Sequence, residues 1–339
     1  MWRRPIRSTA PRLPELGVTG DGQLIDRLRP LARAAGVLDR ISVVYIEGDV
    51  RRDAHIGAAL DTVYEIGSIT KTMTSALFAD VVESGLVRTD ARLGSLLELG
   101  SSPAACTTLE ELASHRSGLP RIASGLRDRT SAVIAVLRHR NPYTVDLSRL
   151  LARAEAAKIV ARGQFSYSNL GAALLGQALA ARVGVGYPDL LDRQLFTRLG
   201  MTRSTTPLTS ADLPSEAPYG WSAHGRAEQP WTLGAYAPAG GVRSTPADMT
   251  HYVHALLDST APGLAALEPR WKAHGQSRIG YAWFTDQIDG SEVTWHNGTT
   301  GGFSSMLALD RKRAAAVIVL ANTAVAVDTV ALRLLLEDL

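Results

Sequence analysis

The sequence predicts an α+β fold, in which an antiparallel sheet of N-terminal and C-terminal strands is flanked by helices and joined to a mostly helical second lobe. Three observations predict it. Strand-like segments lie near both ends of the chain, within 41–56 and 292–320. Segments with helical periodicity fill the middle. Apolar helical segments at 23–38 and 329–336 are placed to cover one face of the sheet.

The first elements are a helix and a hairpin. The 23–38 segment repeats apolar residues at helical spacing and has Gly36 near its end, although Pro30 can kink or split the helix. Strands at 41–46 and near 51–56 are separated by a short Glu-Gly-Asp turn, so we expect an antiparallel pair.

The middle of the chain is helical and rich in loops. Thr108 and Glu111 have capping-box spacing at the start of a helix. The segment from 202 to 240 is rich in Pro, Ser, Thr and Gly, which indicates mostly loop. The helices predicted here are 108–115, 131–139, 146–157, 170–183 and 187–199, and those predicted beyond the loop are 247–258 and 329–336. The strands predicted near the C-terminus are 292–296, 303–309 and 315–320.

These elements predict the domain organisation. Residues 1–20, rich in Pro, Arg and Gly, are expected to form a flexible N-terminal arm, and residues 21–339 a single domain. One lobe takes 21–66 and 240–339, and the helical lobe takes 67–239. A cleft between the lobes is the default place for a site.

Composition restricts the function classes. The 339 residues, 45% hydrophobic and 20% charged, are ordinary for a soluble globular protein. The net charge of +3 comes partly from N-terminal arginines, and no aromatic residues alternate with basic ones, so we expect no nucleic-acid partner. No apolar run is long enough to span a membrane. Cys106, the single cysteine, cannot form an internal disulfide and is expected to be buried or inert.

No cofactor or metal is expected. His251 and His254 have a conceivable metal spacing, but no third ligand accompanies them. The N-terminus begins like a charged signal start but no apolar stretch follows, so the chain as given is expected in the cytoplasm, with a removed leader or C-terminal extension left open.

The strongest chemical signal is Ser68-Ile-Thr-Lys71, at the start of a helix that we expect to end near Gly85. Gly67 can take an unusual backbone angle, and Ser68 is placed to cap the helix. Residues three apart share a helix face, so the Lys71 amine should lie beside the Ser68 hydroxyl. A neutral lysine can activate a serine nucleophile. The chain has four lysines among its 36 Lys and Arg residues, so this one is not simply a common surface cation.

Two further segments accompany it: Tyr167-Ser-Asn169 and His296-Asn-Gly298-Thr299-Thr-Gly-Gly302. This order and combination resembles the serine β-lactamase and penicillin-binding-protein superfamily, in the branch of class C β-lactamases, D-alanyl-D-alanine carboxypeptidases and related esterases. Segments 114–120, 199–201 and 238–245 are also similar to that branch, so the resemblance covers about residues 40 to 325. It implies a β-lactamase/transpeptidase-like fold.

The resemblance also implies roles. Ser68 would form an acyl-enzyme, with Lys71 and Tyr167 sharing the duty of general base. Asn169 would hydrogen-bond Lys71 and the substrate amide. The backbone N–H groups of Ser68 and Thr299 would form the oxyanion hole, and Gly298 would let substrate lie along the strand edge.

One position departs from the β-lactamases. Their third motif usually begins with lysine, and this chain has His296. Histidine is mostly neutral at pH 7. The His-x-Gly at this position resembles that of the esterase and peptidase members, which favours an ester or amide substrate over β-lactams.

The sequence thus predicts a serine hydrolase of small acyl, ester, amide or peptide substrates, possibly including D-amino-acid peptides. An acyltransferase that passes the acyl group to an alcohol or amine is the alternative, and a non-catalytic acyl sensor is the third. The sequence contains no Gly-x-Ser-x-Gly motif, which argues against an α/β-hydrolase. Four aromatic residues of the 202–240 segment could either line an apolar pocket or pack in the core. They are Tyr219, Trp221, Trp231 and Tyr236. The sequence does not predict the oligomeric state.

Overall fold

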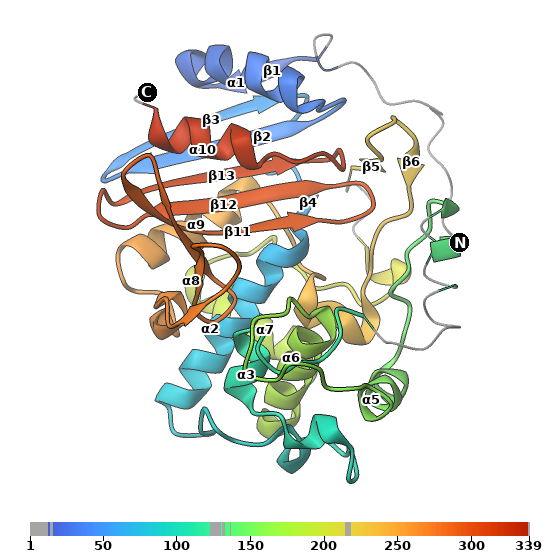
Figure 1. The fold of residues 1–339 in the computed structure, drawn as a ribbon. Helices are drawn as coiled ribbons and strands as arrows, with labels where there is room; N and C mark the ends of the chain where they lie inside the picture. The colour runs from blue at the N-terminus through green and yellow to red at the C-terminus, as the bar shows by residue number, and fades with distance from the viewer. Residues whose placement is uncertain are drawn as a thin grey trace.

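The computed structural model describes residues 13, 16–122, 130, 133–135, 137–213 and 218–337. A nine-stranded antiparallel sheet joins the two ends of the chain, in the order β1-β3-β2-β13-β12-β11-β10-β9-β8 (Figure 1). The strands are β1 (Val18–Gly20), β2 (Ile41–Glu47), β3 (Val50–Ile56), β8 (Trp271–Lys272), β9 (Arg278–Ile279), β10 (Phe284–Ile288), β11 (Ser291–Thr299), β12 (Ser304–Asp310) and β13 (Ala315–Ala321). The predicted fold class is confirmed.

The centre of the sheet is buried on both faces. Val43 and Val317 belong to a core with the helices α1 (Gly22–Ala35) and α10 (Asp328–Leu336), whereas the alternate residues Val44 and Ile318 belong to the core of the helical side. Successive side chains point to opposite faces, so a strand covered on both faces is apolar throughout. In Figure 1, α1 and α10 lie on one side of the sheet and α2 (Thr70–Glu83) lies on the other.

The helical lobe packs around α2 and α6. Both helices are buried on nearly every face because neighbouring elements surround them. Gly176 of α6 allows close packing, since a Cβ there would come 2.3 Å from Pro238. The other helices of this side are α3 (Leu109–Ala113), α5 (Leu147–Glu155), α6 (Asn169–Val183), α7 (Tyr187–Leu191), α8 (Thr197–Leu199) and α9 (Pro246–Leu257).

Most predicted elements are present, with shifted ends. Helix α1 continues through Pro30 and ends at Gly36, which has a φ of +82°, so the helix is not split. The capping box of Thr108 and Glu111 is formed, although α3 is shorter than expected. The predicted helix at 131–139 lies partly outside the described residues. The span 202–240 also contains the short hairpin of β5 (Gly220–Trp221) and β6 (Ala227–Glu228).

Three expectations differ from the structure. Residues 1–20 were expected to form a flexible arm, but β1 lies within them and pairs with β3. The rest of the predicted arm lies almost wholly outside the described residues. Strands β8, β9 and β10 were not predicted, because they are short and polar enough to resemble loop. Cys106 is exposed rather than buried.

One buried strand pair lies directly beside the site. Strand β4 (Tyr64–Glu65) pairs with β7 (Arg243–Ser244), directly before the turn that carries Ser68.

No single helix of the described ranges has both the length and the apolar character of a membrane span. The helix α6 and the Tyr187–Leu199 stretch, bent by 79°, pass that test only as a pair.

Candidate active site

Ser68 lies in the short 3-10 turn η2 (Gly67–Ile69), which leads directly into α2. Gly67 has a φ of +50°, and a Cβ built on it would come 2.9 Å from the backbone nitrogen of Thr299. Gly67 therefore lets this turn approach β11 closely. The turn begins after Ile66 and has no side-chain cap, so the expectation that Ser68 caps the helix is wrong.

Lys71 lies one turn further along, with its side chain almost fully buried. Its Nζ donates to Ser68 Oγ at 2.8 Å and to the carbonyl of Ala239 at 2.5 Å. Burial, and secondarily the charge of Arg121, holds the pKa of Lys71 well below its usual value. No salt bridge of the described residues includes Lys71. The lowered pKa favours the neutral form of the amine, which can take the proton of Ser68 across the same distance.

Tyr167 reaches Ser68 from the segment before α6. Its hydroxyl hydrogen-bonds the Ser68 side chain, and Lys71 Nζ lies 4.9 Å from the centre of its ring. Burial raises the pKa of Tyr167, against the opposing effects of Ser68 and Arg121. The phenol thus keeps its proton, so Lys71 is the group of this pair that can accept one in the resting site.

The end of β11 runs beside the serine turn. Strand β10 pairs only with residues 291–295 of β11, so the stretch from His296 to Thr299 has no strand on that edge. A Cβ on Gly298 would come 2.9 Å from the backbone nitrogen of Ser68. The backbone N–H groups of Ser68 and Thr299 therefore lie on adjoining segments at an open strand edge.

His296 is buried in this wall and uncharged. Its Nδ1 lies 2.6 Å from the carbonyl oxygen of Asn297, so Nδ1 carries the proton and donates it. The Nε2 atom is buried and has no hydrogen-bond partner. Burial and the neighbouring Lys71 lower the pKa of His296 to about 3. A neutral residue thus stands at the position where the resemblance expects lysine.

His115 is a site residue that the sequence reading did not single out. It follows α3 with a φ of +57°, and its ring centre lies 4.4 Å from that of Tyr167. Its Nδ1 accepts the backbone N–H of Ser168 at 3.2 Å, which leaves a buried, unpartnered Nε2–H. Burial, followed by Lys71 and His296, lowers its pKa. The signal was present, because His115 belongs to a segment recognised as similar to the family.

Asn169 does not make its expected bond to Lys71. It opens α6, and its Nδ2 donates to the hydroxyl of Tyr143 at 3.2 Å. Its Oδ1 is buried and has no partner. The expected bond to Lys71 is replaced by that from Lys71 to Ala239, leaving an Asn169 oxygen available to a ligand N–H.

The aromatic residues of the 202–240 segment that were considered as pocket lining lie in different parts of the structure. Trp231 and Tyr236 pack against Tyr143, with ring centres 5.3 Å away in each case. Trp221 instead belongs to the end of the sheet, where its Nε1–H donates to Asp39 at 2.9 Å. Tyr219 is exposed. Trp231 and Tyr236 thus support the site from behind Tyr143.

Potential metal ligands do not gather in the described part of the chain, where no group of three or more His, Cys, Asp or Glu side chains could hold an ion. His251 and His254 lie on α9, and His251 is exposed.

Comparison with known proteins places this geometry in a family. The family model described as Beta-lactamase matches residues 27–338. The D-alanyl-D-alanine-carboxypeptidase/endopeptidase AmpH of Escherichia coli (strain K12) is 30% identical over 216 residues, which are 62% of this chain and 53% of that protein. Penicillin-binding protein 4 of Amycolatopsis lactamdurans is 27% identical over 195 residues, 51% of this chain and 44% of that protein. The chain spans about half the length of the curated relatives it matches.

Solved structures show the same fold. A class C β-lactamase from Rhodobacter sphaeroides superposes with a TM-score of 0.75 at 19% identity, covering 89% of this chain and 94% of that one. The D-alanine carboxypeptidase AmpC from Burkholderia cenocepacia superposes with a TM-score of 0.75 at 21% identity, covering 92% and 98%. The resemblance found in the sequence motifs is confirmed. The chain belongs to the β-lactamase family.

Proposed function

We propose that this protein is a serine hydrolase that cleaves an ester or amide bond through an acyl-enzyme on Ser68. The observation that carries the proposal is the 2.8 Å contact between Ser68 Oγ and the amine of Lys71, whose burial lowers its pKa. A serine hydroxyl becomes a useful nucleophile when a neighbouring base takes its proton. Lys71 provides such a base without a carboxylate to hold it in the charged form.

In acylation, the substrate carbonyl would lie at the open edge of β11, with its oxygen toward the N–H groups of Ser68 and Thr299. Ser68 Oγ attacks the carbonyl carbon, and its proton passes to Lys71. The tetrahedral oxyanion is stabilised by the two backbone donors, each worth about 10²–10³ in rate. The bond to the leaving group then breaks as Tyr167 donates its proton to that group, and Lys71 returns a proton to Tyr167.

Deacylation would use the same groups in reverse. A water molecule takes the place of the leaving group and attacks the acyl carbon. Tyr167 accepts the proton of the water as it gives its own proton to Lys71. The bond to Ser68 Oγ then breaks, and the serine recovers its proton. His115, which packs against Tyr167 and fixes the Ser168 N–H, would hold the phenol in place during both steps.

The substrate class follows from His296. Its buried imidazole is neutral, so this wall offers no permanent charge to the carboxylate of a β-lactam. We therefore infer that esters, amides or D-amino-acid peptides are better substrates than β-lactams. The similarity to a D-alanyl-D-alanine carboxypeptidase supports peptides as candidates.

An acyltransferase remains the second candidate. Ser68 is partly exposed while its neighbours from Val63 to Gly67 are buried, so an acyl group on it can meet an acceptor other than water. Product analysis with added alcohols or amines separates the two functions: transfer products would support acyltransferase activity, and unchanged products at saturating acceptor would exclude it for those acceptors.

The direct test compares wild type with Ser68→Ala on p-nitrophenyl acetate and butyrate, and on a fluorescent penicillin. Ser101→Ala, at an exposed serine, is the matched control. Ester turnover that disappears only in Ser68→Ala, with weak turnover of the penicillin, is the expected result. Ester turnover or covalent labelling that persists in Ser68→Ala would refute the acyl-enzyme proposal.

A further inference from the structure

Arg121 places a positive charge beside the candidate active site. Its carbonyl oxygen accepts the backbone N–H groups of Asn169 at 3.0 Å and Leu170 at 3.3 Å, which fixes its backbone at the start of α6. Its guanidinium carbon lies 5.5 Å from the centre of the Tyr167 ring. Arg121 is exposed, so an incoming substrate can reach it.

Within the described ranges, this charge has no partner of opposite sign, and no salt bridge there includes Arg121. Burial lowers the pKa values of the basic groups deeper in the site, Lys71 and His296. A guanidinium group does not lose its proton in proteins, so Arg121 is a permanent cation beside neutral catalytic groups.

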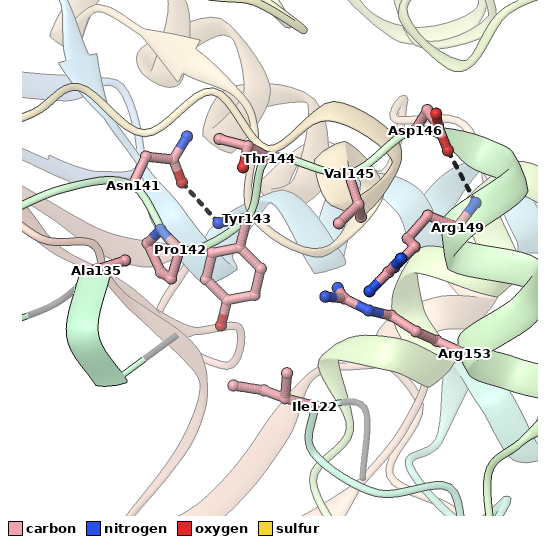
Figure 2. Close-up of a pocket in the computed structure, with 10 residues that line it drawn as sticks. All are labelled: Ile122, Ala135, Asn141, Pro142, Tyr143, Thr144, Val145, Asp146, Arg149 and Arg153. Atoms are coloured by element: carbon pink, nitrogen blue, oxygen red, sulfur yellow. Dashed lines mark hydrogen bonds between the residues drawn. The ribbon is translucent and has the colours of Figure 1, made fainter. Parts of the chain in front are cut away.

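A cavity of about 430 Å³ lies next to this position. Figure 2 shows Tyr143 in its wall, with the guanidinium groups of Arg149 and Arg153 directed toward the same space. Ile122, the residue after Arg121, also lines it. Among the described residues of the lining, the charged ones are Arg149, Arg153 and Asp146.

Tyr143 connects this cavity to the catalytic groups. Its ring lines the cavity, and its hydroxyl accepts the hydrogen bond from Asn169. The buried Asn169 Oδ1 has no partner, so it is an acceptor for an N–H on the substrate. A substrate that places its acyl part along Asn169 and Tyr143 would therefore pass Arg121 and meet this cavity.

We propose that Arg121 binds a carboxylate carried by the acyl part of the substrate, and that the cavity beside Tyr143 accommodates that part. The inference rests on the proposed function of Ser68. It assigns recognition of the substrate's charge to Arg121, in the segment after α3, instead of to the β11 wall, where His296 is neutral. Arginine suits this role because its planar guanidinium donates two parallel hydrogen bonds to a carboxylate.

The experiment uses two pairs of esters. In the first, p-nitrophenyl hemiadipate carries a carboxylate on the acyl part, and p-nitrophenyl methyl adipate has the same group masked. In the second, p-acetoxybenzoate carries the carboxylate on the leaving group, and its methyl ester masks it. The kcat/KM ratio within each pair is measured for wild type, Arg121→Gln and Arg121→Lys. Arg92→Gln removes an equal charge from an exposed position outside the site and is the control.

We expect wild type to prefer hemiadipate over its methyl ester by at least about tenfold. Arg121→Gln should remove that preference, Arg121→Lys should keep part of it, and Arg92→Gln should leave the ratio unchanged. Equal ratios in wild type and Arg121→Gln would overturn the inference, as would a preference confined to the p-acetoxybenzoate pair. Turnover that persists in Ser68→Ala would instead refute the proposed function.

Discussion

Gly298 and Ser68 meet backbone to backbone, and a Cβ added to Gly298 would lie 2.9 Å from the Ser68 nitrogen and 2.1 Å from the Ile66 oxygen. Contacts under 3 Å to backbone atoms require β11 or the serine turn to move. The distance between the two proposed oxyanion donors therefore depends on the absence of a side chain at position 298.

Gly298→Ala is accordingly expected to lower kcat for p-nitrophenyl acetate by about 10²–10³, the effect of losing one oxyanion donor. The matched control is Gly22→Ala, where a Cβ would have no neighbour within 4 Å. Steady-state kinetics and thermal unfolding of both variants check the prediction. A Gly298→Ala enzyme with unchanged kcat would show that Thr299 does not contribute to the oxyanion hole.

The lowered pKa of Lys71 predicts the pH profile. If the neutral amine is the base, kcat/KM rises with pH as Lys71 loses its proton and reaches its plateau well below about pH 10.5, the ordinary pKa of lysine. Arg121→Gln removes a neighbouring charge that lowers this pKa, so its acid limb should move to higher pH. A profile that still rises steeply above about pH 10 would contradict a neutral Lys71.

Replacement of the base gives a second, independent readout. Lys71→Arg keeps a cation but cannot accept the serine proton, so kcat should fall by about 10²–10⁴. Lys158→Arg, at an exposed lysine, is the control. Single-turnover acylation with a p-nitrophenyl ester measures the affected step. Activity within a few-fold of wild type in Lys71→Arg would exclude lysine as the base.

The regular elements were predictable because their signals are local. The β2 and β13 strands are runs of β-branched and other apolar residues, and a sheet covered on both faces requires that composition. Thr108 and Glu111 cap α3 through bonds between residues three apart. By contrast, β10 carries Thr285, Asp286 and Gln287 in succession, so its polar sequence alone does not distinguish a strand from a loop.

The site was predictable in its residue types and less so in its contacts. Ser68 and Lys71 are three residues apart, so their proximity follows from the helix. The bond from Asn169 to Tyr143 joins residues 26 apart, and that from Lys71 to Ala239 joins residues 168 apart. No local pattern encodes such pairs. The position of Arg121 beside Tyr167 likewise depends on the tertiary fold.

The buried pair of Glu65 and Arg243 is predicted to stabilise the segment that carries Ser68. The two side chains are almost fully buried and hydrogen-bonded to one another, and Glu65 Oε1 also accepts the N–H of Trp231 at 2.9 Å. Arg243→Met would leave a buried carboxylate without its partner, which costs about 3–5 kcal/mol of unfolding free energy. Urea denaturation measures this loss.

The control for that variant is Arg311→Met. Arg311 pairs with Glu268 at 3.1 Å on the surface, so its loss should cost less than about 1 kcal/mol. The double variant Glu65→Leu with Arg243→Met removes both buried charges and should recover much of the lost stability. Equal effects of the buried and exposed single variants would contradict a structural role for the buried pair.

Two buried neutral histidines predict that stability falls in mild acid. The folded-state pKa of His296, about 3, lies below its unfolded value of about 6.5, and burial lowers the pKa of His115 in the same direction. Between these values the unfolded chain binds protons that the folded chain does not, so the unfolding free energy decreases as pH falls from about 6.5 toward 3. Each histidine contributes a slope approaching about 1.4 kcal/mol per pH unit.

Urea denaturation of wild type and His296→Gln, at several pH values between about 7.5 and 5, tests this slope. Removing one of the two histidines should make the pH dependence shallower, whatever the substitution does to stability at neutral pH. His224→Gln, at an exposed histidine in the turn between β5 and β6, should leave the slope as in wild type. An unchanged slope in His296→Gln would mean that the imidazole binds a proton as readily in the folded protein as in the unfolded chain, and the site wall would then carry the positive charge that its burial excludes.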